Sequence, residues 1–361
     1  MPPVEYAPPL TAPALPISRW QRTGPIVALL LLSPIISEVL YGATRISVIF
    51  VLIPEILTWG CAALIIRESV RRWNKGWQSM LLLGLALAVA EEWVIQQTSI
   101  APLVGLAKHA YGRVWGVNWV YFLWALGYES AWVVLVPVQL TELLFPARRK
   151  QPWLRTRGLV IASLVFLVGA CMAWYGWTQR ARVMIFHMPP YSPPPLYLAA
   201  AVVVIVLLVL AAYTMSSAHS RHSELSPNAA PSPLLLGMVV TALGSAWAAF
   251  VLLSFGSLPA VPYSLALAAG VACCGLTLFL MRRWTSSSDW GDAHRFALVF
   301  GGILGCMLGG FAVFKIGGAL RIDWIGKAIL NVAAVAWLIM IGRTIVGRTI
   351  DGAPRITESS R

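Results

Sequence analysis

Two adjacent glutamates inside an apolar stretch are the residues of this sequence best suited to chemistry. Glu91 and Glu92 begin the run EEWVIQQT, and Glu92 and Gln96 are four residues apart, so on a helix they share one face. Two neighbouring carboxyl groups in a medium of low dielectric constant do not both ionise readily, so we expect at least one to hold a proton at neutral pH. Such a pair can act as a general acid and base or as a proton relay.

Four more glutamates lie in apolar stretches of the same part of the chain. They are Glu38, Glu55, Glu129 and Glu142, whereas the apolar stretches after residue 156 contain no carboxylate. An ionisable group at membrane depth is costly, so it persists where it faces a bundle interior, is paired, or takes part in function. This concentration predicts that Glu38, Glu55 and Glu129 share one polar site with the glutamate pair.

The remaining polar residues of this region are assigned by their position along the predicted helices. Gln96 and Asn118 are expected to line the same site, because Gln96 shares a face with Glu92 and Asn118 lies about three helical turns before Glu129. Glu142 lies at the inner end of its stretch, and we expect it to form a surface ion pair with the arginines that follow it. The alternative for the buried glutamates is that they are neutral and only hold helices together.

The elements that position these side chains are predicted to be membrane-spanning helices. Of the 361 residues, 58% are hydrophobic and 11% are charged, and the mean hydropathy is +0.75. A soluble domain has about 25% charged residues, so the composition excludes a soluble enzyme, a disordered chain and a disulfide scaffold. A spanning helix needs about 20 mostly apolar residues. Ten stretches satisfy this condition: 25–43, 46–66, 79–100, 116–145, 157–178, 195–215, 234–255, 261–281, 294–315 and 325–345.

The basic residues predict the orientation of this bundle. The net charge is +13, and Lys and Arg concentrate in the loops after the second, fourth and eighth stretches. The positive-inside rule places these loops and both termini in the cytoplasm. The charge is then explained by anchoring in the lipid bilayer, and no nucleic-acid partner is expected. We predict an all-α polytopic protein of about ten transmembrane helices, integral to the plasma (inner) membrane.

The organisation along the chain follows from these stretches. We predict a disordered cytoplasmic tail over 1–24, a carboxylate-bearing half of four spans over 25–155, an apolar half of six spans over 156–350, and a cytoplasmic tail over 351–361. The ninth span carries Gly301, Gly305 and Gly309, a spacing of four that lets two helices pack closely. This ridge predicts either packing within the chain or a homodimer contact.

The run Glu91-Glu92-x-x-x-Gln96 resembles the EExxxR motif of CPBP-type intramembrane proteases, the CAAX-processing and bacteriocin-processing group. The resemblance implies a related fold and peptide hydrolysis inside the membrane. In that family the glutamate pair and later transmembrane histidines hold a divalent metal or activate water. This sequence departs from the family pattern at Gln96, which replaces the arginine. The later motifs FxxxH and HxxxN or HxxxD have no counterpart within a predicted span.

Three functions stay open. In a CPBP-like hydrolase, degenerate in its motifs, Glu91 and Glu92 would activate water, and Glu129 with Asn118 would complete the catalytic site, with a divalent metal as the cofactor that the resemblance implies. In a proton- or cation-coupled transporter, Glu55, Glu92 and Glu129 would carry the coupling ion. In a structural membrane protein, the glutamates would serve helix packing alone. The substrate is accordingly a membrane peptide, a small solute, or none.

Overall fold

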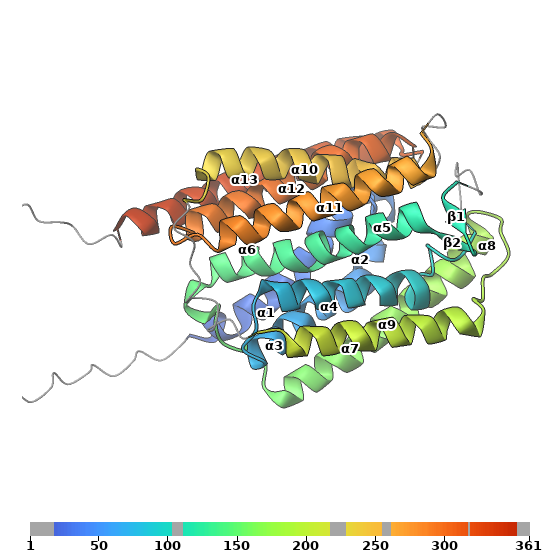
Figure 1. Ribbon diagram of the computed structural model, residues 1–361, viewed down its shortest axis with the longest axis horizontal. Helices are drawn as coiled ribbons and strands as arrows, with labels where there is room; N and C mark the ends of the chain where they lie inside the picture. Colours follow the sequence, from blue (N-terminus) through green and yellow to red (C-terminus); the bar gives the residue numbers. More distant parts are fainter. Residues whose placement is uncertain (1–17, 103–110, 217–228, 255–260, 317, 352–361) are drawn as a thin grey trace, which may run out of the picture.

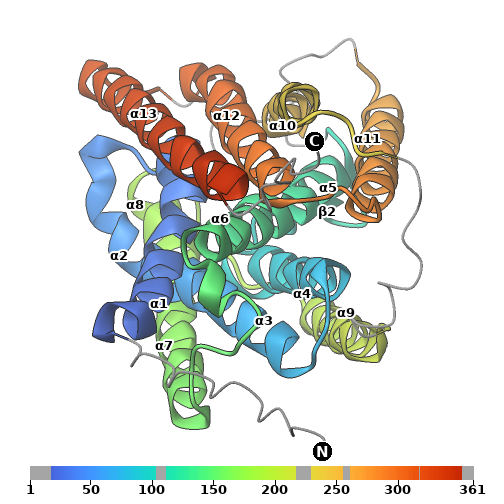
Figure 2. The same cartoon turned by 90° about the vertical axis from the view of Figure 1, so that its left-hand side faces the viewer.

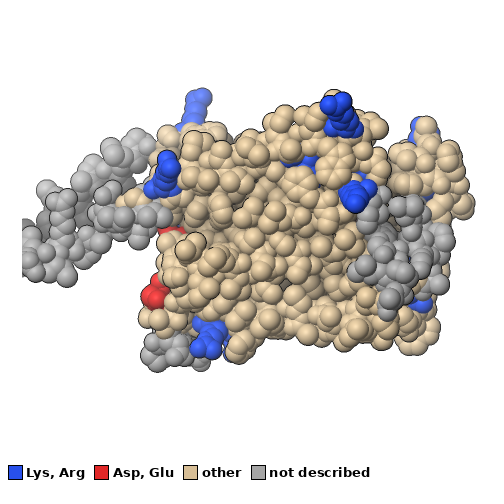
Figure 3. Space-filling model, turned by 90° about the horizontal axis from the view of Figure 1, so that it is seen from above, with Lys and Arg blue, Asp and Glu red and all other residues tan. Residues whose placement is uncertain are grey.

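The computed structural model describes residues 18–102, 111–216, 229–254, 261–316 and 318–351, and it shows a bundle of long helices (Figure 1). The predicted spans are confirmed as helices, because ten described helices are long and apolar enough to cross a membrane. The first of them begins, and the last ends, at the same end of the bundle (Figure 1). On the face drawn in Figure 3 most of the surface is uncharged, with a few separate Lys and Arg side chains. Ten long apolar helices are the mark of a helical membrane protein.

The first four spans each contain a π-helical turn, in which the helix is locally widened. Span one consists of α1 (Arg19–Pro34) and the π turn η1 (Ile35–Leu40). Span two begins with a 3₁₀ turn, η2 (Ile46–Val51), and continues through α2 (Leu52–Glu55), the π turn η3 (Ile56–Gly60) and α3 (Cys61–Arg72). Span three is α4 (Trp77–Ala90) with the π turn η4 (Glu91–Ile95). Span four is one unbroken helix, α5 (Trp119–Tyr128), the π turn η5 (Glu129–Leu135) and α6 (Val136–Leu144).

Of the other six spans, span five also contains a π turn, and spans six to ten are each one α-helix. Span five is α7 (Thr156–Trp174), which continues through the π turn η7 (Tyr175–Ala181) into α8 (Arg182–Met184). Spans six to ten are α9 (Pro195–Thr214), α10 (Pro233–Ser254), α11 (Tyr263–Thr285), α12 (Asp292–Ile316) and α13 (Arg321–Asp351). A short antiparallel hairpin, β1 (Arg113–Val114) and β2 (Val117–Asn118), precedes span four, and the 3₁₀ turn η6 (Pro146–Arg148) follows it.

Several predicted boundaries were wrong by a few residues, and local backbone chemistry explains two of them. The first helix begins at Arg19 and not at residue 25, since Ser18 and Gln21 form a capping box that starts it earlier. The second span runs on to Arg72. The third ends at Ile95, because the backbone of Gln97 turns to a positive φ of 61° and cannot continue the helix.

Span four lies in the middle of the bundle (Figure 2). The helices α3, α4, α7 and α9 lie on one side of it, and α10, α12 and α13 lie on the other (Figure 2). Two apolar cores result, and span four contributes to both: Trp132 belongs to the core on the α10–α13 side, and Val133 belongs to the core on the α3–α9 side. Residues carried by span four are therefore in contact with most of the molecule.

The glycine ridge of span nine packs within the chain. A Cβ atom added at Gly301 would lie 2.6 Å from the carbonyl oxygen of Gly237, and one added at Gly309 would lie 2.5 Å from the Cβ of Ala248; a side chain at Gly305 would meet the backbone of the same helix, α10. This confirms the prediction of packing within the chain. A homodimer through this ridge would require α10 to leave it.

Candidate functional site

Every glutamate of the predicted site lies in or next to a π turn. Glu38 lies within η1, Glu55 directly precedes η3, Glu91 and Glu92 begin η4, and Glu129 begins η5. A π turn inserts one residue into the helix and is frequent at functional sites. Four of these carboxyl groups are buried, with exposed fractions of 4% for Glu55, 2% for Glu91, 3% for Glu92 and 7% for Glu129, and Glu38 is half-buried.

Glu92 is held in place by the chain segment that follows its helix. The backbone N–H of Ser99 donates to Oε2 of Glu92 at 2.9 Å, and the Ser99 hydroxyl donates to the same oxygen at 2.7 Å. This arrangement depends on Gln97, whose left-handed backbone reverses the chain and brings Ser99 back towards η4. The orientation of the Glu92 carboxyl is therefore determined by two donors from a neighbouring residue.

The Glu91 carboxyl lacks hydrogen bonds of this kind. Both of its carboxyl oxygens are buried and have no hydrogen-bond partner, and Oε2 of Glu129 is also buried without one. The indole N–H of Trp59 interacts electrostatically with the Glu129 carboxyl without making a hydrogen bond of normal geometry. An unpaired buried polar group costs roughly 1–3 kcal/mol. Such groups mark positions where a protein gives up stability for chemistry or for a polar ligand.

Electrostatic interactions link the five carboxyl groups. Glu91 interacts electrostatically with Glu92 and Glu38. Glu129 interacts with both members of the pair, although it is carried by the next span. Glu38 interacts with Glu129 on one side and with Glu55 on the other. That these residues form one functional site stays a prediction.

The two uncharged residues predicted to line the site have local structural roles. Asn118 is 1% exposed and caps α5: its Oδ1 accepts the N–H of Tyr121 at 3.0 Å, and its Nδ2 donates to the carbonyl oxygen of Ser254 at 3.3 Å. The backbone N–H of Gln96 donates to the carbonyl oxygen of Glu91 at 2.8 Å, which completes the π turn. Both residues position the glutamate-bearing helices.

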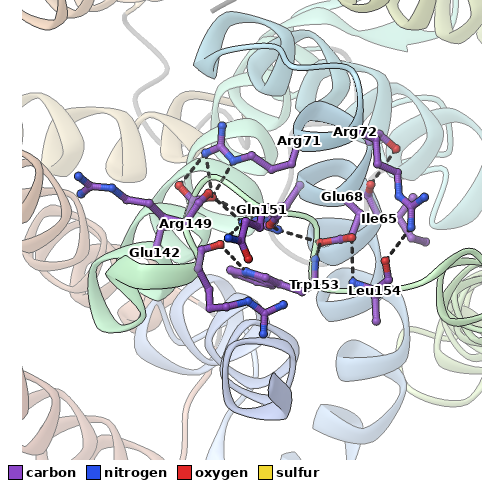
Figure 4. Close-up of polar contacts among 12 residues, drawn as sticks. Ile65, Glu68, Arg71, Arg72, Glu142, Arg149, Gln151, Trp153 and Leu154 are labelled. Carbon is purple, nitrogen blue, oxygen red and sulfur yellow. Dashed lines mark hydrogen bonds and ion pairs between the residues drawn. The ribbon is translucent and has the colours of Figure 1, made fainter. Parts of the chain in front are cut away.

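The prediction for Glu142 was wrong in its partners and in its exposure. Glu142 is 4% exposed and pairs with two arginines of span two: Nε of Arg67 lies 3.1 Å from Oε1, and Nη2 of Arg71 lies 2.6 Å from Oε2 (Figure 4). The predicted partners, the arginines that follow Glu142 in sequence, point elsewhere. Because span two extends past residue 66, its basic residues reach the inner end of span four.

Glu68, which the sequence analysis missed, completes this cluster. Its carboxylate accepts the backbone N–H groups of Trp153 at 2.8 Å and Leu154 at 3.0 Å (Figure 4). The Arg67 guanidinium lies 2.8 Å from Glu68 and stacks over the Trp153 ring, 3.5 Å from its centroid. The segment after span four is thereby attached to span two. The adjacent opposite charges of Arg67 and Glu68 at the end of an apolar stretch were the available signal.

Lys327 and Asp323 are further buried charges that the sequence analysis missed. Nζ of Lys327 donates to the carbonyl oxygens of Leu40 at 2.8 Å and Tyr41 at 2.7 Å. The Asp323 carboxylate accepts the N–H of Ser47 at 2.9 Å. Lys327 was visible in the sequence as a charge near the start of a predicted span. Asp323 was placed just outside it, but α13 begins at Arg321.

The donor groups do not fit a resident divalent metal. Within the part of the chain that the structure describes, no group of three or more His, Cys, Asp and Glu side chains is placed to hold a metal ion. His187 and His294 are described, and His109, His219 and His222 lie outside the described residues. No step proposed below is routed through a metal.

No protein-family model, no curated protein and no solved structure matches this chain. The resemblance to CPBP-type proteases therefore stays a prediction carried by Glu91 and Glu92.

Proposed function

We propose that the chain is a CPBP-like intramembrane hydrolase in which Glu91, Glu92 and Glu129 perform acid–base chemistry on a membrane peptide. One observation carries the proposal: of two adjacent buried carboxyl groups, one is oriented by two hydrogen bonds and the other has both oxygens free. A pair of acids in different environments is the arrangement that separates a general acid from a general base.

The reaction that this arrangement supports is the hydrolysis of a peptide bond by one water molecule. The free carboxylate of Glu91 takes a proton from the water as its oxygen bonds to the carbonyl carbon of the substrate. A protonated Glu129, facing from the next span, gives its proton to the leaving nitrogen as the carbon–nitrogen bond breaks. The proton on Glu91 then returns to Glu129, and the site is restored. Glu92 is fixed in position by Ser99 and stays protonated, because two adjacent carboxyl groups in a medium of low dielectric constant do not both ionise readily.

The test is cleavage of quenched fluorogenic peptides with an apolar stretch by purified protein in detergent. Glu91→Gln and Glu129→Gln are expected to abolish cleavage, because each removes a proton-transfer group and keeps the shape of the side chain. Asp289→Asn is the matched control, since Asp289 is an exposed carboxylate. Full cleavage by the Glu91→Gln variant would refute the proposal.

Proton-coupled transport is the second candidate, and the position of Glu55 favours it. The carboxyl groups continue from Glu129 through Glu38 to Glu55, so proton-binding groups extend beyond the three that hydrolysis needs. Glu55→Gln separates the candidates. A hydrolase of the proposed kind keeps most of its peptidase activity without this carboxyl, whereas a transporter in proteoliposomes loses its response to an imposed pH gradient as completely as with Glu91→Gln.

A further inference from the structure

The five carboxyl groups of the candidate site, Glu38, Glu55, Glu91, Glu92 and Glu129, are called the carboxylate set. A small cavity lies beside this set, between the end of span one and span ten. Its volume is about 10 Å³, and its lining includes Gly42, Thr44, Arg45, Asp323 and Lys327. About 10–15 Å³ of such space holds one water molecule when several polar groups surround it. The cavity meets both conditions, which is unusual in a bundle whose helices are otherwise apolar.

The cavity is kept open by structural features of its wall. Lys327 is 3% exposed, and its ammonium group is held by the carbonyl oxygens of Leu40 and Tyr41 and lies 4.6 Å from the centroid of the Phe311 ring. Gly42 has a φ of +99°, and a Cβ atom there would lie 2.8 Å from the Phe314 ring and 3.1 Å from Nζ of Lys327. Only glycine suits this backbone and leaves this space.

Thr44 connects the cavity to the carboxylate set. Its side chain lines the cavity, and its hydroxyl donates to Oε1 of Glu55. Oε2 of Glu55 is buried and has no hydrogen-bond partner. Beyond Glu55 the interactions continue to Glu38 and then to Glu129. Only the Thr44 hydroxyl therefore lies between water in the cavity and the Glu55 carboxyl.

We propose that this cavity and the Thr44–Glu55 pair form an entry port that supplies water and exchanges protons with the buried carboxylate set. This inference rests on the proposed function, since hydrolysis inside a membrane consumes water that must cross apolar surroundings. The charged residues that line the port are Arg45 before span two and Asp323 and Lys327 from span ten. Lys327 holds the wall of the port and Thr44 forms its inner end.

The experiment measures hydrogen–deuterium exchange at the Glu55 carboxyl in protein reconstituted in lipid. The Glu55 band is identified in infrared difference spectra as the carboxylic-acid band that Glu55→Gln removes, at a pH where that band is present. After transfer to D₂O the wild-type band shifts rapidly. Thr44→Val, which keeps the shape and removes the hydroxyl, is expected to slow the shift by at least about tenfold, equivalent to about 1.4 kcal/mol in the barrier.

Two variants complete the test. Thr44→Ser retains the hydroxyl and is expected to exchange at the wild-type rate. Thr58→Val is the matched control, because Thr58 is a fully buried threonine of the same span whose hydroxyl donates to the Pro54 carbonyl at 2.9 Å, and it is expected to leave the rate unchanged. Exchange in Thr44→Val as fast as in the wild type, or equal slowing in Thr58→Val, would overturn the port.

This readout is independent of peptide cleavage. If Glu91→Gln abolishes cleavage and Thr44→Val exchanges at the wild-type rate, the hydrolase proposal stands and the port is wrong. If no peptide is cleaved and Thr44→Val slows exchange, the port stands and hydrolysis is wrong.

Discussion

Ser99 donates two hydrogen bonds to the Glu92 carboxyl, from its backbone N–H at 2.9 Å and from its hydroxyl at 2.7 Å. Neither carboxyl oxygen of the neighbouring Glu91 has a hydrogen-bond partner. Seven residues separate Ser99 from Glu92, so the contact exists only because the chain reverses after span three. The two neighbouring glutamates therefore differ in the hydrogen bonding of their carboxyl groups, although their side chains are chemically identical.

Removing the Ser99 hydroxyl should reduce activity more than stability. Ser99→Ala keeps the backbone donor and removes one hydrogen bond to a carboxyl, a change of roughly 1–3 kcal/mol, so kcat/KM for peptide cleavage should fall about tenfold or more. Ser79→Ala is the matched control, because Ser79 is a fully buried serine whose hydroxyl has no partner. Equal losses in the two variants would show that Ser99 does not act through Glu92.

We expect the buried Glu91 carboxyl to lower the stability of the protein and to be required for its activity. Glu91→Gln and Glu91→Leu remove a buried carboxyl whose oxygens are unpaired, so the melting temperature in detergent should stay the same or rise, and cleavage should be lost. If the glutamates only hold helices together, the result reverses: Glu91→Gln keeps its function and Glu91→Leu folds poorly. Thermal melts and cleavage assays on the same samples distinguish these outcomes.

The ion cluster at the inner end should be a determinant of stability. Glu142→Gln removes one of the two carboxylates paired with the buried guanidinium of Arg67 and leaves Glu68 as the other, so the loss should lie at the lower end of the about 3–5 kcal/mol that breaking a buried pair costs. Arg72→Gln is the control: Arg72 is exposed and makes one bond to the Leu154 carbonyl, so its loss should be within about 0.5 kcal/mol. Unfolding in denaturant measures both, and equal effects would contradict a special role for the buried pair.

Lys327 should tolerate neither a neutral nor a larger replacement. Lys327→Met leaves the carbonyl oxygens of Leu40 and Tyr41 without a donor, at roughly 1–3 kcal/mol for each group. Lys327→Arg keeps the charge, but its planar fork is bulkier in a wall closed by Gly42 and Gly310, whose added Cβ atoms would each lie 3.1 Å from Nζ. Both variants should lower the melting temperature; a wild-type melt for Lys327→Arg would show that the wall is loose.

The close packing of α10 on the glycine ridge can be tested by replacing a ridge glycine with a larger residue. Gly305→Val inserts a side chain where a Cβ already lies 2.8 Å from the Thr241 carbonyl oxygen, so α10 and α12 should separate and the folded yield should collapse. Gly275→Ala is the control, since nothing lies within 4 Å of a Cβ there, and it should be neutral or slightly stabilising. If Gly305→Val instead gave a folded monomer from a wild-type dimer, measured by light scattering in detergent, the ridge would be an interface between chains.

Much of this molecule was predictable from hydropathy and spacing. The run of apolar residues around Glu129 predicted a helix, and the same argument placed Glu38, Glu55, Glu91 and Glu92 within helices. The π turns that carry them were not predictable, because a widened turn follows from side chains of other spans that stabilise the displaced carbonyl groups. In η1, for example, the Ser37 carbonyl accepts the hydroxyl of Tyr128 from span four.

The sequence by itself determined that ten apolar helices form and that six glutamates lie within the first four of them, because transfer of a helix into lipid depends on the composition of that segment alone. Only the tertiary structure decided that Glu92 is held and Glu91 is free, and that Glu142 pairs with Arg67 rather than with its sequence neighbours. Hydrogen bonds and ion pairs act over a few ångströms, so their partners are selected by how distant segments pack.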